Sequence, residues 1–141
     1  MSTAPNPYND RIISEFRENG GTVTTGHGSG LLLLHSTGAK SGEQRINPVL
    51  GIADGDGWLI AASKGGSPEN PSWFHNLLAN PETEVEVPAG DHVDTVAVNA
   101  EVVSDADYSA VWDRFVARSR GFAQYAERTA RRIPVVRLVR R

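Results

Sequence analysis

Hydrophobic residues with helical spacing predict four short helices in this chain. Ile12 and Phe16 share one face of the first helix, which Asn9 can cap. In the second helix, Asn70 supplies the capping side chain and Pro71 takes the first helical position. The predicted helices cover residues 9–19, 70–79, 104–118 and 121–131.

The segments between these helices have the length and pattern of β-strands. Residues 31–36 are largely apolar, whereas the valines after residue 84 alternate with polar or charged residues. Residues 54–57, Asp-Gly-Asp-Gly, are a hairpin signal, so the strands on either side should pair antiparallel. The predicted strands cover residues 31–36, 44–53, 58–63, 85–87, 96–102 and 133–139.

This order of elements favours a closed sheet. Hairpins, and not repeated strand-helix-strand crossovers, connect the strands, which disfavours a doubly wound parallel sheet. Six mostly antiparallel strands in a small chain bury their apolar faces by curling into a barrel with helices across its openings. We therefore expect an α+β fold that is mainly β: a six-stranded, mostly antiparallel β-barrel with flanking helices, in one domain over residues 1–141.

The composition is that of an ordinary globular protein, with 39% hydrophobic and 22% charged residues among 141. The chain has no cysteine, which excludes disulfides, thiolate nucleophiles and cysteine-ligated metal sites. No signal-peptide pattern opens the sequence, and no apolar run approaches the roughly 20 residues that span a bilayer. A cytoplasmic protein is expected.

The charge is unevenly distributed. The net charge is −3, yet residues 113–141 contain nine arginines and two acidic residues. These arginines can neutralise an acidic body, flank an anionic ligand, or contact an anionic membrane or nucleic-acid surface, and the first interpretation is the simplest. We expect no nucleic-acid partner and allow weak peripheral contact with the inner face of the plasma membrane.

Both lysines of the chain lie in loops rich in glycine and serine. Lys40 and Ser41 lie in the segment 38–42, and Lys64 lies between Ser63 and two glycines. Glycines let backbone N–H groups converge on an anion, serine adds a donor, and lysine adds a mobile cation. Arg45 could add a planar fork for phosphate or carboxylate. The alternative, that these are solvated turns, stays open for either loop alone.

Motifs of several other chemistries are missing. There is no P-loop, the glycines at 26–30 precede a strand instead of joining a strand to a helix, and no G-x-S-x-G elbow occurs. The four histidines lack an i,i+4 metal pair. Glutamates at 82, 84 and 86 are interpreted as a solvated strand face. Phe122 and Tyr125, three residues apart on one helical face, could line either the core or a pocket.

Several segments together resemble the deazaflavin-dependent nitroreductase family. The resemblance is dense from about residue 31 to 87 and sparser afterwards. It rests on LLLHSTGAKSGEQR at 32–45, Asn47-Pro48, AASKGG at 61–66, NPSW at 70–73, NLLANP at 76–81, and Phe122, Tyr125 and Ile133-Pro134-Val135.

This resemblance implies a split β-barrel that binds coenzyme F420 as hydride carrier. It places the phosphodiester and acidic tail against the two lysine loops and Arg45, and the ring near Pro48, Val49 and residues 61–63. Ser63 and Tyr125 are the expected catalytic residues. The implied cofactor-binding residues are Lys40, Ser41, Arg45, Pro48, Val49, Ala61, Ala62, Ser63, Lys64, Gly65, Gly66, Asn70, Trp73 and Asn76.

The expected substrate pocket is lined by Leu50, Phe122 and Tyr125. The family's nitroimidazole-reducing member has tyrosines at the positions of Leu50 and Phe122, so a more apolar electrophile, such as a quinone, enone or unsaturated lactone, fits better than a nitro compound. Reduced F420 would transfer a hydride to this substrate, and water or Tyr125 would supply the proton. The alternatives are an FMN-dependent enzyme of the same barrel type and a non-catalytic deazaflavin- or haem-binding protein. No metal site is expected, and the chain could form a homodimer.

Overall fold

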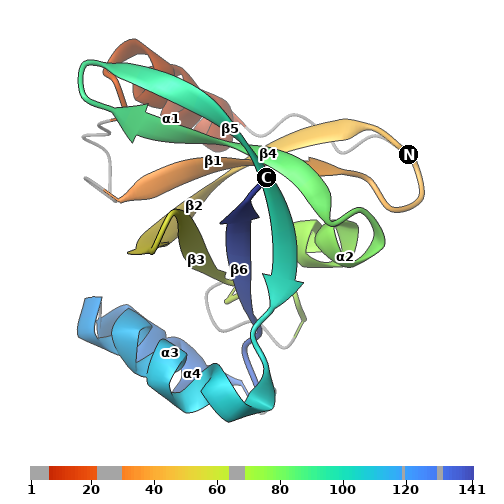
Figure 1. Ribbon diagram of the computed structural model, residues 1–141, viewed down its shortest axis with the longest axis vertical. Coiled ribbons are helices and arrows are strands. Elements are labelled where there is room, and N and C mark those ends of the chain that lie inside the picture. The colour runs from red at the N-terminus through yellow and green to blue at the C-terminus, as the bar shows by residue number, and fades with distance from the viewer. Residues whose placement is uncertain (1–6, 22–29, 64–68, 119, 130–131) are drawn as a thin grey trace.

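The computed structural model describes residues 7–21, 30–63, 69–118, 120–129 and 132–141, which form six strands and four helices around a closed β-barrel (Figure 1). The strands follow the order β1-β2-β3-β6-β5-β4, and every pair of neighbours is antiparallel. The prediction of an α+β, six-stranded antiparallel barrel is confirmed. The elements are α1 (Pro7–Glu18), β1 (Leu31–Thr37), β2 (Gln44–Asp54), β3 (Gly57–Ala61), α2 (Ser72–Ala79), β4 (Glu82–Ala89), β5 (His92–Val102), α3 (Asp105–Arg118), α4 (Arg120–Arg128) and β6 (Val135–Arg140).

The barrel interior is a single apolar core that α2 closes at one end. Alternate residues point inward along each strand, so Leu32 and Leu34 of β1 meet Val85 of β4 inside the barrel. Phe74 and Leu77 of α2 join the same cluster and are almost fully buried. These contacts hold α2 in a fixed position against one end of the barrel.

Two further apolar clusters lie on the outside of the barrel. Helix α1 packs Ile12 and Phe16 against Leu31 and Leu33, the residues of β1 that point outward. On the other side, α3 and α4 pack against the outer faces of β2, β3 and β6, and Figure 1 shows these two helices together below the barrel. The outer face of β2 thus lies between α1 on one side and α3 and α4 on the other.

Two helices begin elsewhere than the sequence pattern predicts. Helix α1 begins at Pro7, so Asn9 lies within the helix and does not cap it. Helix α2 has Pro71, and not Asn70, at its N-cap, with no side-chain capping bond. The Pro71 carbonyl accepts a hydrogen bond from the Phe74 N–H at 3.0 Å, so the backbone itself satisfies this donor of the first turn.

Candidate functional site

The turn between β1 and β2 carries Lys40 and Ser41 and is closed by its own hydrogen bonds. The Gly38 N–H donates to the Glu43 carbonyl at 2.8 Å, and the Gly42 N–H donates to the Gly38 carbonyl at 2.9 Å. The Ser41 hydroxyl accepts a hydrogen bond from the Glu43 N–H at 3.2 Å. Lys40 is exposed, so its ammonium group extends into solvent from a turn of defined shape.

Helix α2 is bonded to the strand that leads into this turn. The buried Asn76 side chain accepts a hydrogen bond from the Ala39 N–H through Oδ1 at 3.1 Å and donates from Nδ2 to the Ser36 hydroxyl at 3.3 Å. One helical turn later, Asn80 Nδ2 donates to the Thr37 carbonyl at 3.4 Å. The side chain of Asn76, a predicted cofactor ligand, is therefore bonded to two groups of the protein.

The pairing between β2 and β3 ends part-way along β2. It runs from the hairpin only as far as Gly51 and Ile60. Beyond that pair, residues 44–50 have strand partners on β1 alone within the described part of the chain, while Ala61 pairs with Val135 of β6. Residues 44–50 and 61–63 therefore separate beyond the last β2–β3 pair. In the described part of the chain, the edge of β2 that faces residues 61–63 is open.

The residues predicted to contact a cofactor ring flank this open edge. Pro48 and Val49 lie on β2, Ala61 ends β3, and Ala62 and the half-buried Ser63 follow. The side chains of Val49 and Ala62 pack into the barrel core, and the Ala62 N–H donates a hydrogen bond to the Pro134 carbonyl at 2.9 Å. The other predicted residues of this loop, Lys64, Gly65 and Gly66, lie outside the described residues.

Three more predicted cofactor residues have defined places. Arg45 is half-buried, and its guanidinium Nη2 lies 3.7 Å from Glu43 Oε2. Trp73 is buried and packs into the barrel core from α2, while Asn70 is half-buried just before that helix. Arg45 is the charged residue of the three, and it lies near the turn that carries Lys40.

The predicted substrate residues come together under α3 and α4. Phe122 meets Phe115 and Trp112 edge to face, with ring centroids 5.1 and 6.0 Å apart, and Tyr125 meets Phe122 at 5.7 Å. Leu50 of β2 packs against the same cluster and is half-buried. Leu50, Phe122 and Tyr125 therefore belong to one apolar cluster next to the open edge of β2.

Arg118 borders the same cluster, although the sequence marks it only as one of the nine arginines of residues 113–141. Gly30, just before β1, has a φ of +97°, and a Cβ built there would lie 2.7 Å from Arg118 Nη2 and 3.3 Å from Leu50 Cδ1. The guanidinium and the Leu50 side chain thus occupy the space that a side chain at residue 30 would need. The glycine-rich segment before β1 was a signal that another residue packs closely against the backbone here, but it did not indicate which residue does so.

A buried carboxylate joins α1 to the barrel. Glu86 is 6% exposed; its two oxygens accept hydrogen bonds from Arg17 at 2.9 and 2.7 Å, and His35 Nε2 lies 2.7 Å from Oε2. The Arg17 guanidinium holds the pKa of Glu86 below its usual range, against the opposing effect of burial. The prediction of a solvated face holds for Glu82 and Glu84 but is wrong for Glu86, because α1 covers this part of β4.

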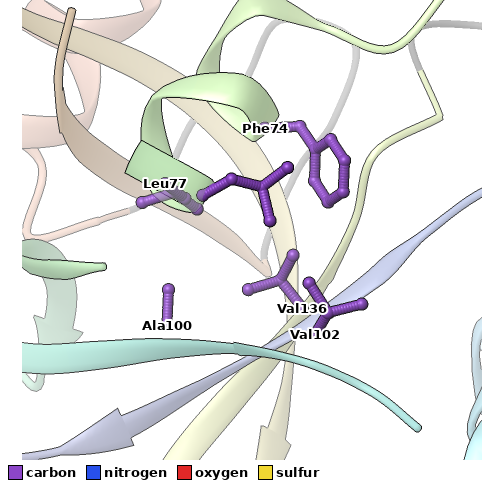
Figure 2. Close-up of a pocket in the computed structure, with 6 residues that line it drawn as sticks. Phe74, Leu77, Ala100, Val102 and Val136 are labelled. Atoms are coloured by element: carbon purple, nitrogen blue, oxygen red, sulfur yellow. The ribbon is translucent and has the colours of Figure 1, made fainter. Parts of the chain in front are cut away.

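A small apolar pocket lies elsewhere, between α2 and strands β5 and β6 (Figure 2). Leu78 and Val102 at its rim are 56% and 50% exposed. Among the described residues, none of the predicted cofactor or substrate residues lines this pocket, and its described lining contains no polar side chain to orient a ligand. We do not assign the reaction to this pocket. It is lined by Phe74, Leu77, Leu78, Ala100, Val102 and Val136.

In the part of the chain that the structure describes, histidine, aspartate and glutamate side chains form no group of three or more that could hold a metal ion. None of the helices in the same residues combines the length and the apolar character needed to cross a membrane.

Comparison with known proteins identifies the family. The sequence profile described as F420H(2)-dependent quinone reductase matches residues 10–140, which is nearly the whole chain. The chain belongs to this family. Membership gives the reaction: reduced F420 is the hydride donor and a quinone-type molecule is the acceptor. The predictions of an F420-dependent oxidoreductase and of F420 as cofactor are confirmed.

Individual relatives agree with this assignment. An F420H(2)-dependent quinone reductase of Mycobacterium tuberculosis is 42% identical over 111 residues, which cover 78% of this chain and 73% of the relative. A solved F420-H2 dependent reductase superimposes with a TM-score of 0.66 at 33% identity, covering 77% of this chain and 93% of that one. The haem storage protein HutZ of Vibrio cholerae, at 14% identity, 94% and 89% coverage and a TM-score of 0.61, shares the fold alone.

Proposed function

We propose that F420 binds along the open edge of β2, with its ring at the end of the β2–β3 ladder. The observation that carries this placement is the end of strand pairing at Gly51 and Ile60. Pro48 lies on one side of this opening, and Ala61 and Ser63 lie on the other. A flat ring inserted here would lie between the backbone of β2 and that of residues 61–63, where the Pro48 carbonyl could accept a hydrogen bond from the polar edge of a deazaflavin.

The acidic tail would run along β2 toward the turn of Lys40. A strand rises about 3.4 Å per residue, so Arg45 lies roughly 10 Å from Pro48 along β2. Lys40 and Arg45 would then meet the phosphodiester and the acidic groups of the tail, while Ser41 and the loop of Lys64, Gly65 and Gly66 would add donors. A ligand with a ring at one end and several negative charges at the other fits this order of residues better than a ligand with one phosphate.

The quinone would be held by the side chains of the expected substrate pocket, Leu50, Phe122 and Tyr125. When bound, reduced F420 supplies the hydride. Leu50 and Phe122 would place the quinone against the ring and keep water away, which accounts for much of the rate gain in a reaction that needs no protein nucleophile. Hydride transfer leaves the quinone as an anion, and the Tyr125 hydroxyl would donate the proton that completes the hydroquinone. Ser63 would bond the ring from the other side.

The apolar lining of this cluster favours quinones over the other electrophiles that the sequence allowed. Leu50 and Phe122 present no hydroxyl group, so a nitro group would lose its hydrogen bonds with water on entering. Enones and unsaturated lactones would fit sterically but carry one carbonyl where a quinone carries two. A quinone gains most from hydride transfer because the product is aromatic.

Turnover with purified protein tests this proposal. Reduced F420 and a water-soluble benzoquinone should be consumed in a one-to-one ratio, with the oxidised cofactor detected by its absorbance. Replacing Pro48 or Ala61 by a bulky residue, as in Ala61→Trp, should abolish turnover because both flank the ring. Arg140→Ala, at the far end of the barrel beside Asp56, should leave turnover unchanged. Full activity of Ala61→Trp would overturn the placement of the ring.

The same proposal includes the location and assembly of the protein. A protein of known structure with 30% identity and a TM-score of 0.68, covering 92% of both chains, is a domain-swapped dimer. We infer that this chain forms homodimers, resides in the cytoplasm and makes weak contact with the membrane surface, where lipid-soluble quinones are found. Light scattering measures the first point, and sedimentation with anionic lipid vesicles measures the last.

A further inference from the structure

Both ends of the Asn76 amide are hydrogen-bonded within the protein. Its side chain is buried, its Oδ1 accepts the Ala39 N–H at 3.1 Å, and its Nδ2 donates to the Ser36 hydroxyl at 3.3 Å. The two bonds fix which end of the amide is oxygen, because a backbone N–H requires an acceptor. Ser36 is fully buried on β1, and Ala39 immediately precedes Lys40.

From these contacts we propose that Asn76 is a positioning residue for F420: it fixes the turn that presents Lys40 and does not touch the cofactor. This inference rests on the proposed binding of the acidic tail at Lys40. The turn closes on itself through Gly38, Gly42 and Glu43, but these bonds leave its direction relative to the barrel undetermined. The bond from Asn76 to the Ala39 N–H ties the turn to α2, which is anchored in the barrel core.

The orientation of the turn matters because Lys40 is a point charge on a long, flexible side chain. If the backbone at Ala39 moves, the ammonium group spreads over a larger volume and spends less time against the tail. Cofactor affinity would then fall although no group in contact with the cofactor has changed. The reacting ring is proposed to lie beside Pro48, roughly 10 Å from Arg45 along β2, so the rate of hydride transfer at saturating cofactor should not change.

Asn80 offers a matched comparison. It is the C-cap residue of α2, four residues after Asn76, and its Nδ2 donates to the Thr37 carbonyl at 3.4 Å. That bond reaches the end of β1 before the turn begins. Asn80→Ala therefore removes a similar helix-to-strand bond while the bond to Ala39 remains.

The test combines amide exchange with cofactor binding. In the protein without cofactor, NMR hydrogen exchange at the Ala39 amide should accelerate in Asn76→Ala and stay unchanged in Asn80→Ala. The dissociation constant of F420, measured by fluorescence titration, should rise about five- to fiftyfold in Asn76→Ala and less than about twofold in Asn80→Ala. Asn76→Asp keeps an oxygen for the Ala39 N–H and should keep that amide protected, which supplies a second variant if Asn76→Ala does not fold.

A double-mutant cycle separates positioning from contact. If Asn76 acts through Lys40, then adding Asn76→Ala to Lys40→Ala should weaken binding by less than about twofold further, because there is no cation left to position. Fully additive effects would show that Asn76 acts on binding independently of Lys40 and would overturn the positioning role. If Lys40→Ala binds F420 as tightly as the natural protein, the placement of the tail itself is wrong, and the inference fails with it.

Discussion

Lys40 combines exposure with a fixed backbone, which makes it the simplest residue to test. Its ammonium group is proposed to bind the remote acidic tail, so Lys40→Ala should raise the dissociation constant of F420 by about ten- to a hundredfold, as expected for loss of one charge-assisted hydrogen bond. The single-turnover rate at saturating cofactor should stay nearly constant. Fluorescence titration and stopped-flow absorbance measure the two quantities.

A matched change of charge controls this measurement. Arg140→Ala also removes one positive charge, but its guanidinium Nε donates to the Asp56 carbonyl at the opposite end of β2. It should leave the affinity for F420 unchanged at moderate salt, where charges more than about 10 Å away are screened. A slower hydride transfer in Lys40→Ala at saturation would instead place Lys40 beside the ring.

Tyr125 is the residue whose proposed role is chemical. Tyr125→Phe keeps the ring that packs against Phe122 but removes the proton donor, so the turnover number should fall at least about tenfold with little change in KM. Tyr108→Phe serves as control, since its hydroxyl donates to the Ile133 carbonyl at 2.6 Å. That variant should lose about 1 kcal/mol of stability and keep its turnover. Equal turnover in Tyr125→Phe and the natural protein would leave water as the proton source.

At the scale of elements, one carboxylate, Glu86, adds an ion pair to the apolar contacts that attach α1 to the barrel. Glu86→Gln keeps the size of the side chain but removes the charge that pairs with Arg17, which is itself half-exposed. We expect a loss of about 1–2 kcal/mol in the free energy of unfolding at pH 7. Glu84→Gln, at an exposed position of the same strand, should change stability by less than about 0.5 kcal/mol.

The pH dependence of that loss has a definite sign. The pKa of Glu86 is lowered in the folded protein, so its contribution is complete above the unfolded value of about 4.3 and declines as the pH falls through the folded value. Urea denaturation at pH 7 and near pH 3 should therefore show the gap between Glu86→Gln and the natural protein shrinking in acid. A gap of the same size at both values would mean that the charge of Glu86 is not what holds α1.

The elements differ in how far the sequence predicts them. Spacing and hairpin signals predicted six strands and four helices because each signal is local: residues 54–57 specify a turn whatever surrounds them. The burial of Glu86 was missed because it depends on α1 lying across β4, a contact between residues 69 positions apart. The hydrogen bond between Asn76 and the Ala39 N–H could not be predicted for the same reason, since the two residues lie 37 positions apart.

Across the whole molecule, the barrel separates the core from the site. Among the described residues, apolar side chains from the strands and α2 form the core cluster inside the barrel, and we place the chemistry at the outer face of β2 and the helices beside it. Residues such as Pro48 and Leu50 could be assigned from resemblance to a family. Their position on the open side of an incomplete β2–β3 ladder could not, because the point where two strands part is set by the closure of the whole barrel.

The barrel and its helices together determine which substrate the protein accepts. Because Leu50 and Phe122 line the proposed pocket without hydroxyl groups, benzoquinones should be reduced at a kcat/KM at least about tenfold above that of bicyclic nitroimidazoles. The double variant Leu50→Tyr with Phe122→Tyr should narrow this ratio, since each tyrosine supplies a hydrogen bond worth about 1 kcal/mol to a nitro group. The same assay with FMN in place of F420 should show no turnover, because FMN lacks the acidic tail that Lys40 and Arg45 are proposed to bind. Faster reduction of the nitroimidazole by the natural protein would contradict the apolar pocket, and a ratio that the double variant leaves unchanged would place Leu50 and Phe122 away from the substrate.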